Sequence, residues 1–93
     1  ILCGFVSDKD VDAALRCFPP EAICFFSQAQ IPRALPYDVL TQQALDAGLQ
    51  GQGYASIPDA LQAVMQQAGP DDLLLITGSF FIMQEVYEFF GRV

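Results

Sequence analysis

Two acids and the only lysine of the chain stand together in the segment Asp8-Lys9-Asp10. As chemistry, the Lys9 ammonium could neutralise an anionic ligand, while Asp8 or Asp10 could hold a metal ion or an ammonium group. As structure, acids in the first turn of a helix complement its dipole and need no ligand. Both interpretations stay open, and the structural one is the plainer because first-turn acids are common.

Arg33 lies in a proline-bracketed segment, Ile31-Pro32-Arg33-Ala34-Leu35-Pro36. Because proline fixes the backbone, this segment could hold the guanidinium in place to bind a carboxylate through two parallel hydrogen bonds. A surface arginine on a stiff connection would have the same sequence. The residue types alone favour neither interpretation.

Gly78-Ser79-Phe80 follows an apolar run and precedes a helical pattern. Glycine permits close backbone approach, so free amides and the Ser79 hydroxyl could bind a carboxylate or a phosphate. Ser79 could also cap its own helix, which is the commoner use. The sequence contains neither G-x-x-x-x-G-K-[ST] nor G-x-G-x-x-G, and therefore brings no complete nucleotide-phosphate loop.

Apolar runs and helical spacings alternate along the chain, which predicts four strands and four helices. The runs lack alternation, as is typical of strands buried on both faces of a parallel sheet. Strands are predicted at 1–6, 22–26, 51–55 and 73–77, the third of them weak and near an edge. Helices are predicted to begin after Ser7, Ser56 and Ser79, and a further one has Pro36 in its first turn and ends at Gly48. The predicted inner faces of the helices are Val11, Ala14, Leu15 and Phe18; Val39, Leu40 and Ala44; Ala60, Leu61, Val64, Met65 and Ala68; and Ile82, Val86, Phe89, Phe90 and Val93.

This βαβαβαβα order predicts an α/β fold, a three-layer Rossmann-like domain with a mainly parallel sheet of about four strands and helices on both faces. Ligands bind outside the carboxyl ends of the strands in such sheets. The segments that follow the strands are therefore expected to converge at one edge: Ser7–Asp10, Ser27–Arg33, Tyr54–Ser56 and Thr77–Ser79.

The 93 residues carry 53% hydrophobic and 16% charged residues, which predicts one folded domain over residues 1–93. A net charge of −7 makes nucleic acid and anionic membranes poor partners. No apolar run reaches the length of a membrane span, and three cysteines without a C-x-x-C pair suit a reduced, cytoplasmic protein. The absence of histidine argues against a zinc site and a histidine base, so no metal site is expected. Because Ile1 opens inside an apolar run, we expect a piece of a longer chain.

Three segments together resemble the C-terminal domain of bacterial folylpolyglutamate synthase, which is often also a dihydrofolate synthase and is related to the Mur ligases. They are Gly4-Phe5-Val6-Ser7-Asp8-Lys9-Asp10, Gln30-Ile31-Pro32-Arg33-Ala34-Leu35, and Gly78-Ser79-Phe80-Phe81 with Glu85-Val86 downstream. The resemblance implies an ATP-dependent ligase of folate metabolism that joins L-glutamate to folate or dihydropteroate. By position, it implies that Arg33 grips a substrate carboxylate, that Lys9 faces the amino acid, and that Ser79 and Phe80 lie beside the glutamate site, with Asp8 and Asp10 as secondary candidates.

The same resemblance implies that ATP and magnesium are bound mainly by another, N-terminal domain, with no cofactor on this piece. The family's D-G-A-H-N strand is absent from the sequence, so the resemblance implies a partial C-terminal domain. We therefore expect the piece alone to be inactive, and to associate with itself through an uncovered sheet edge or apolar surface.

A non-catalytic α/β module is the alternative. A phospho-acceptor receiver shares the alternating elements but needs a lysine after its last strand, whereas Lys9 follows the first. An interaction subunit could use the eight phenylalanines as a docking face, although most of them fall at predicted core positions.

Overall fold

A computed structural model describes residues 1–6, 10–69, 72, 74–78 and 80–91, with the backbone alone at 80 and 81. Strands and helices alternate along the whole chain, as the sequence predicts. The strands are β1 (Leu2–Gly4), β2 (Ile23–Phe26), β3 (Gln50–Gly53) and β4 (Ile76–Gly78), and the helices are α1 (Val11–Leu15), α2 (Tyr37–Asp46), α3 (Ile57–Gln67) and α4 (Phe80–Phe90).

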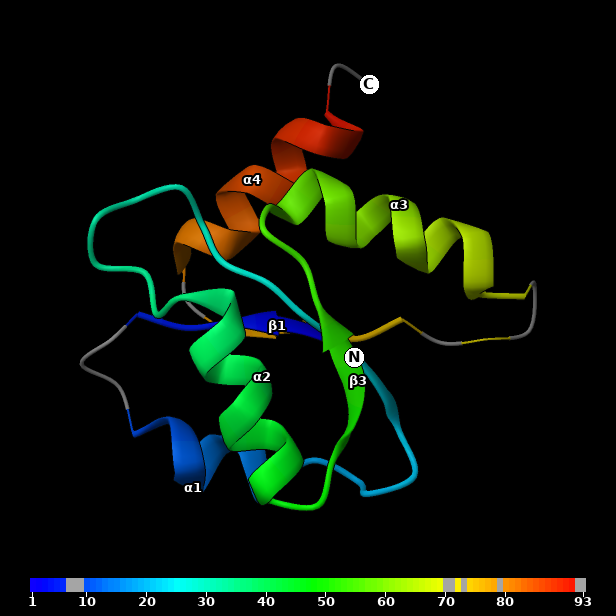
Figure 1. The fold of residues 1–93 in the computed structure, drawn as a ribbon. Helices are drawn as coiled ribbons and strands as arrows, with labels where there is room; N and C mark the ends of the chain where they lie inside the picture. Colours follow the sequence, from blue (N-terminus) through cyan, green and yellow to red (C-terminus); the bar gives the residue numbers. More distant parts are fainter. Residues whose placement is uncertain (7–9, 70–71, 73, 79, 92–93) are drawn as a thin grey trace.

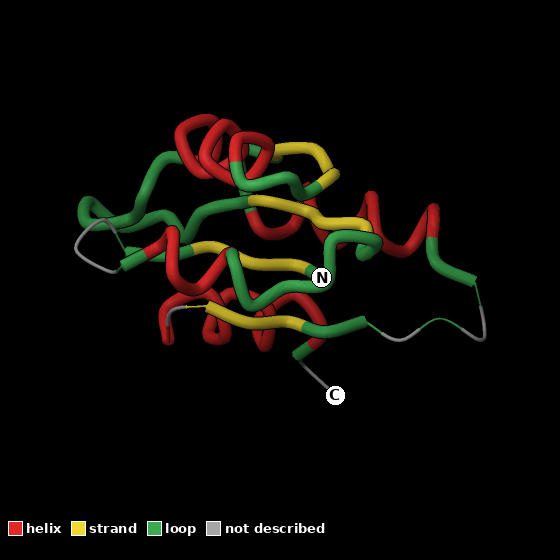
Figure 2. The backbone as a smooth tube through the Cα atoms, turned by 90° about the horizontal axis from the view of Figure 1, so that it is seen from below, coloured by secondary structure: helices red, strands yellow, loops and turns green. Residues whose placement is uncertain are grey.

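The four strands form one sheet in the order β3-β2-β1-β4, and every pair in it is parallel. Leu2 pairs with both Phe25 and Ile76, so β1 lies in the middle of the sheet with β2 and β4 on its two sides. Figure 2 shows the strands running side by side between the helices. The glycine-thinned strand β3 lies at an edge, as predicted.

Helices cover both faces of the sheet, which confirms the predicted three-layer α/β fold (Figure 1). Successive residues of a strand point to opposite faces. Leu2 and Phe25 accordingly pack with α3 and α4, whereas Cys3 and Phe26 pack with α1 and α2. None of the helices in the described part of the chain is both long and apolar enough to cross a bilayer.

The first helix begins later than the sequence predicts. A Ser-x-x-acid pattern would start it after Ser7, which lies outside the described residues, but the observed N-cap is Asp10. Its carboxylate accepts a hydrogen bond from the Ala13 amide at 3.2 Å, so the acid itself satisfies a free donor of the first turn. Ser56 caps α3 in the predicted way, and Gly48 adopts a φ of 89° after α2.

The strand predicted at 73–77 is shorter and lies further along the chain, at Ile76–Gly78. Its apolar run begins earlier, but Leu75 is 52% exposed and contributes only its carbonyl, which accepts from the Leu2 amide at 2.8 Å. The strand is short because its partner β1 offers only three residues for pairing. An apolar run predicts that a strand is present and does not fix where pairing starts.

Several predicted inner residues of the helices are exposed. Val39 is 44%, Met65 63% and Phe90 44% exposed, and Ala68 is exposed as well. Each helix packs on the sheet along one narrow stripe, so a residue about 100° away from the buried one faces solvent. Val93, also predicted inside, lies outside the described residues. The remaining predicted core of α3 and α4 is buried at Ala60, Leu61, Val64, Ile82 and Val86.

Candidate functional site

The carboxyl edge of the sheet is closely packed around two glycines. A β-carbon on Gly4 would overlap the Ser27 carbonyl and the Ile82 side chain, and one on Gly78 would overlap the Gly4 carbonyl. Gly78 also has a φ of 130°, which side-chain-bearing residues rarely adopt. The ends of β1, β2 and β4 therefore approach one another at the edge where the sequence predicts a ligand.

Residues 27–36, which we call the crossing loop, lead from the end of β2 to α2 over this edge. At its start, Ser27 is fully buried and its amide donates to the Cys3 carbonyl at 2.9 Å. The Ser27 hydroxyl donates to the Tyr54 carbonyl at 2.9 Å. At its end, the Tyr37 amide donates to the Gln28 side-chain oxygen at 2.8 Å. Both ends of the loop are thus fixed by hydrogen bonds.

The middle of the crossing loop is held by one glutamine. The Gln30 amide donates to Oε2 of Glu85 on α4 at 2.7 Å, and its side-chain Nε2 donates to the Ala55 carbonyl at 3.0 Å. Gln30 therefore joins the loop both to α4 and to the segment that follows β3. Figure 1 shows the loop as the teal segment that passes α4 before it enters α2.

Arg33 is exposed on this loop, immediately before a residue that pairs with the extension of β1. Ala34 forms an isolated antiparallel bridge with Val6, and the Leu35 amide donates to the Phe5 carbonyl at 2.8 Å. Val6 directly precedes Ser7 and the acid–lysine segment. The backbone thus brings the Arg33 loop to the end of β1, as the parallel-sheet argument predicts.

The other predicted site residues are only partly placed. Asp8, Lys9 and Ser79 lie outside the described residues, and Phe80 is the first residue of α4 with its side chain outside them. Asp10 caps α1, which is the structural role that its position in a first turn suggests. The glutamate-binding roles of Arg33, Ser79, Lys9 and Phe80 stay predictions.

The sequence did not single out the residues that hold the crossing loop. Ser27, Gln28 and Gln30 stand in a segment that is expected at the carboxyl edge, and Gln30 and Glu85 also fall in the segments that carry the resemblance. The sequence assigns a role to none of them. The available signal was that several polar residues directly follow a buried strand. Such side chains often satisfy backbone groups of neighbouring segments. Their partners are 9 to 55 residues away, so spacing could not identify them.

The two thiols of the sheet, Cys3 and Cys24, are buried on the face that packs with α1 and α2, and burial disfavours their thiolate forms. Burial, with a smaller contribution from the neighbouring Cys24, raises the pKa of Cys3 to about 12, and burial also raises the pKa of Cys24. Cys17 is exposed, and its thiol donates to the Ala13 carbonyl at 3.5 Å. Within the described ranges, no three His, Cys, Asp or Glu side chains gather in a way that could hold a metal ion.

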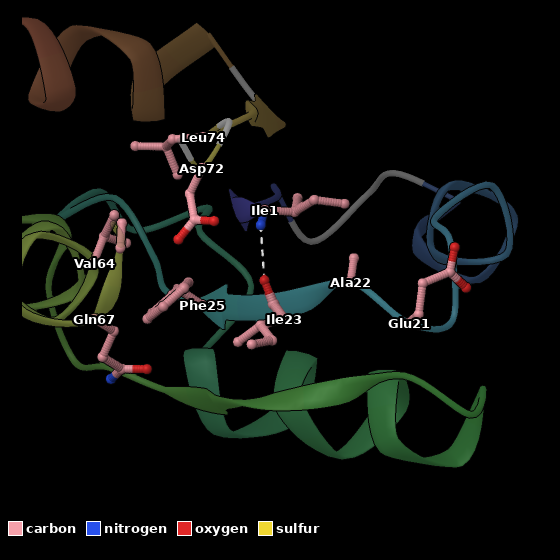
Figure 3. Close-up of a pocket in the computed structure, with 10 residues that line it drawn as sticks. Ile1, Glu21, Ala22, Ile23, Phe25, Val64, Gln67, Asp72 and Leu74 are labelled. Carbon is pink, nitrogen blue, oxygen red and sulfur yellow. Dashed lines mark hydrogen bonds between the residues drawn. The ribbon is translucent and has the colours of Figure 1, made fainter. Parts of the chain in front are cut away.

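A cavity of about 330 Å³ opens at the opposite, amino edge of the sheet (Figure 3). Its wall is mostly apolar, and neither Arg33 nor Asp10 lines it. Two of its polar groups have partners: Asp72 accepts from the Gly69 amide at 2.7 Å, and the Ile1 nitrogen donates to the Ile23 carbonyl at 2.8 Å. The side chains of Glu21 and Gln67 also line the cavity. The carboxyl edge remains the candidate site, because α/β sheets bind ligands outside the carboxyl ends of their strands.

The fold and the edge geometry together define a Rossmann-like α/β domain, consistent with the C-terminal domain of Mur-type ligases. No protein-family model matches the chain, and no curated protein matches it significantly. Two solved structures do match, each with a TM-score of 0.77. One is E. coli FolC in complex with DHPP and ADP, at 25% identity over 94% of this chain. The other is the bifunctional folylpolyglutamate synthase/dihydrofolate synthase from Yersinia pestis, complexed with AMPPNP and Mn ion, at 22% identity over 92%.

These matches confirm the resemblance found in the sequence: over nearly its whole length, the chain is similar in structure to part of FolC. It spans about a fifth of the length of the two solved chains, 21% and 20%. The Yersinia pestis match supports the fold alone, because 22% sequence identity is too low to support a shared function. The coverage is too short to assign the activity of a whole ligase to this chain, so that activity is proposed below.

Proposed function

We propose that this chain is the C-terminal, substrate-closing domain of an ATP-dependent folylpolyglutamate synthase, an amide ligase that joins L-glutamate to folate or to dihydropteroate. The observation that carries the proposal is the coverage: FolC of E. coli matches 94% of the chain at 25% identity. The geometry adds that the Arg33 loop lies at the end of β1, on the edge where α/β sheets bind ligands.

In this proposal the domain contributes donors for the carboxylates of glutamate. A protein with a net charge of −7 repels glutamate globally, so local donors must hold it. Arg33 offers a two-pronged charged donor, Lys9 a point charge, and Ser79 a hydroxyl beside Phe80. The first turn of α4 contains no acid, unlike those of α1, α2 and α3, so its dipole is free to favour an anion. Held in this way, glutamate leaves its amine free to form the amide bond.

In this proposal, ATP and magnesium are bound mainly outside this chain. The sequence has no phosphate loop, and the described residues contain no carboxylate cluster fit for a metal ion. We assign nucleotide and metal binding to an N-terminal ATPase domain of the same polypeptide, which is the domain's main partner. The isolated chain is accordingly expected neither to hydrolyse ATP nor to ligate glutamate.

A ligation assay tests this proposal. The full-length polypeptide that contains this chain is incubated with ATP, magnesium, folate and radiolabelled L-glutamate, and folate-bound label is counted. The proposal expects ligation that requires all four components, and no turnover by the isolated chain. Absence of ligation with folate and with dihydropteroate would overturn it. Sedimentation velocity of the isolated chain tests the separate prediction of self-association.

A further inference from the structure

One carboxylate of α4 is committed to the backbone of the crossing loop. Oε2 of Glu85 accepts the hydrogen bond of the Gln30 amide at 2.7 Å, across 55 residues of sequence. A carboxylate acceptor makes this stronger than a bond between neutral groups. Gln30 reaches on from there to the Ala55 carbonyl at 3.0 Å. The loop that carries Arg33 is therefore tied to two other elements at one residue.

The helix that carries the acceptor, α4, is held firmly in the core. Ile82 and Val86 are 1% and 6% exposed and seat the helix in the core, and Glu85 lies between them in the chain. Glu85 is itself half-buried, so its side chain has few alternative positions. The helix begins at Phe80, directly after the predicted substrate-binding residue Ser79. Glu85 thus links α4, which begins at Phe80, to the loop that carries Arg33.

A carboxylate beside the crossing loop would weaken the binding of glutamate by charge repulsion, so its presence there needs a separate explanation. Glutamate brings negative charge to an already acidic protein, and a further acid beside the loop lowers the local potential. Accepting a backbone hydrogen bond gives that explanation, since a loop fixed before binding loses less entropy when the ligand arrives.

We infer that Glu85 is a positioning residue that acts through Gln30 to fix Arg33 relative to the start of α4. The inference rests on the proposed function, because it assigns Glu85 to the glutamate site of that ligase. Glu85 does not touch the substrate in this account, and its effect passes entirely through Arg33. A surface acid that only stabilises the fold would show no such dependence.

Three variants of the full-length polypeptide separate these roles. Glu85→Ala removes the acceptor and is expected to raise the glutamate KM five- to tenfold with the ATP KM unchanged. Glu85→Gln keeps an acceptor oxygen and is expected to stay within twofold of wild type. Glu88→Ala, which removes an exposed acid from the same helix, is the matched control and is expected to change neither constant. If Glu85→Ala does not fold, Glu85→Met replaces it, because methionine keeps length and helix propensity without an acceptor.

A double-mutant cycle gives the decisive arm. Because Glu85 acts through Arg33, Glu85→Ala is expected to add less than twofold to the glutamate KM in the Arg33→Ala background. Independent multiplication of the two effects, or a Glu85→Gln variant as impaired as Glu85→Ala, would overturn the inference.

Amide hydrogen exchange of the 93-residue chain makes failure of the inference distinguishable from failure of the proposed function. The Gln30 amide is expected to exchange at least tenfold faster in Glu85→Ala than in wild type or Glu85→Gln. Unchanged exchange overturns the inference whatever the enzyme does. A full-length polypeptide without ligase activity overturns the proposed function and, with it, the assignment of Glu85 to a glutamate site, even where the exchange result shows the hydrogen bond.

Discussion

The α-carbon of Gly78 lies against the backbone carbonyl of Gly4, where β4 and β1 end side by side. No side chain fits between them, and the φ of 130° at Gly78 is one that glycine alone adopts readily. Gly78→Ala is therefore expected to lower the free energy of unfolding by about 2 kcal/mol or more. Urea unfolding followed by circular dichroism measures this loss.

Gly69→Ala is the matched control for that substitution, because among the described residues a β-carbon at Gly69 would meet Asp72 alone, at an ordinary contact distance of 3.7 Å. It is expected to change the free energy of unfolding by less than about 1 kcal/mol. Equal effects of the two substitutions would show that the close approach of Gly78 to Gly4 does not constrain the sheet.

The buried hydroxyl of Ser27 anchors the first residue of the crossing loop. Ser27→Ala removes its hydrogen bond and leaves the Tyr54 carbonyl without this partner, which is expected to cost about 1–2 kcal/mol of stability. Thr41→Ala is the control, because the Thr41 hydroxyl donates to a carbonyl within its own helix and its loss is expected to cost about 0.5 kcal/mol. Both losses are measured by chemical unfolding, and a reversed order would contradict the assigned role of Ser27.

The raised pKa of Cys3 predicts that the protein loses stability as the pH becomes alkaline. In the unfolded chain this thiol ionises at a pKa of about 8.5, whereas burial raises the pKa to about 12 in the folded protein. The contribution of Cys3 is therefore complete below about pH 8.5 and is lost as pH rises towards 12, by up to about 1.4 kcal/mol per pH unit.

Comparison with Cys3→Ala isolates this effect from other groups that titrate in the same range. The difference in unfolding free energy between the wild-type protein and Cys3→Ala is expected to shrink between pH 8 and pH 10.5, measured by urea unfolding under reducing conditions. A difference that stays constant over this range would mean that Cys3 ionises equally in the folded and unfolded states.

The sequence predicts a parallel sheet and one of its edge strands, but it does not predict the strand order and places the strand limits less well. Glycines thin the strand Gln50–Gly53, and it lies at the predicted edge of the sheet. The leucine run before Ile76 predicts an early start for β4, but Leu75 is 52% exposed because pairing with β1 covers only three residues. Strand limits depend on the partner strand, which local hydrophobicity does not describe.

The sequence predicts where the candidate site lies, but it does not predict the hydrogen bonds that hold the crossing loop. Parallel strands bring their carboxyl ends together, which is why the loop of Arg33 meets the extension of β1 through the Val6–Ala34 bridge. The bond from the Gln30 amide to Glu85 joins a backbone group to a side chain 55 residues away, and no periodicity or motif encodes such a pair. Only the folded chain reveals it.

Glutamate kinetics of Arg33→Ala in the full-length polypeptide test whether this domain holds the glutamate substrate through Arg33. Arg16→Ala is the control. Arg16 is exposed at the far end of α1, so its removal makes the same charge change away from the candidate site. Arg33→Ala is expected to raise the glutamate KM about ten- to a hundredfold, equivalent to about 1.5–3 kcal/mol, with the ATP KM nearly unchanged. Ser79→Ala is expected to cost less, because backbone donors remain. Glutamate kinetics unaltered in a folded Arg33→Ala variant, or altered equally by Arg16→Ala, would contradict the account.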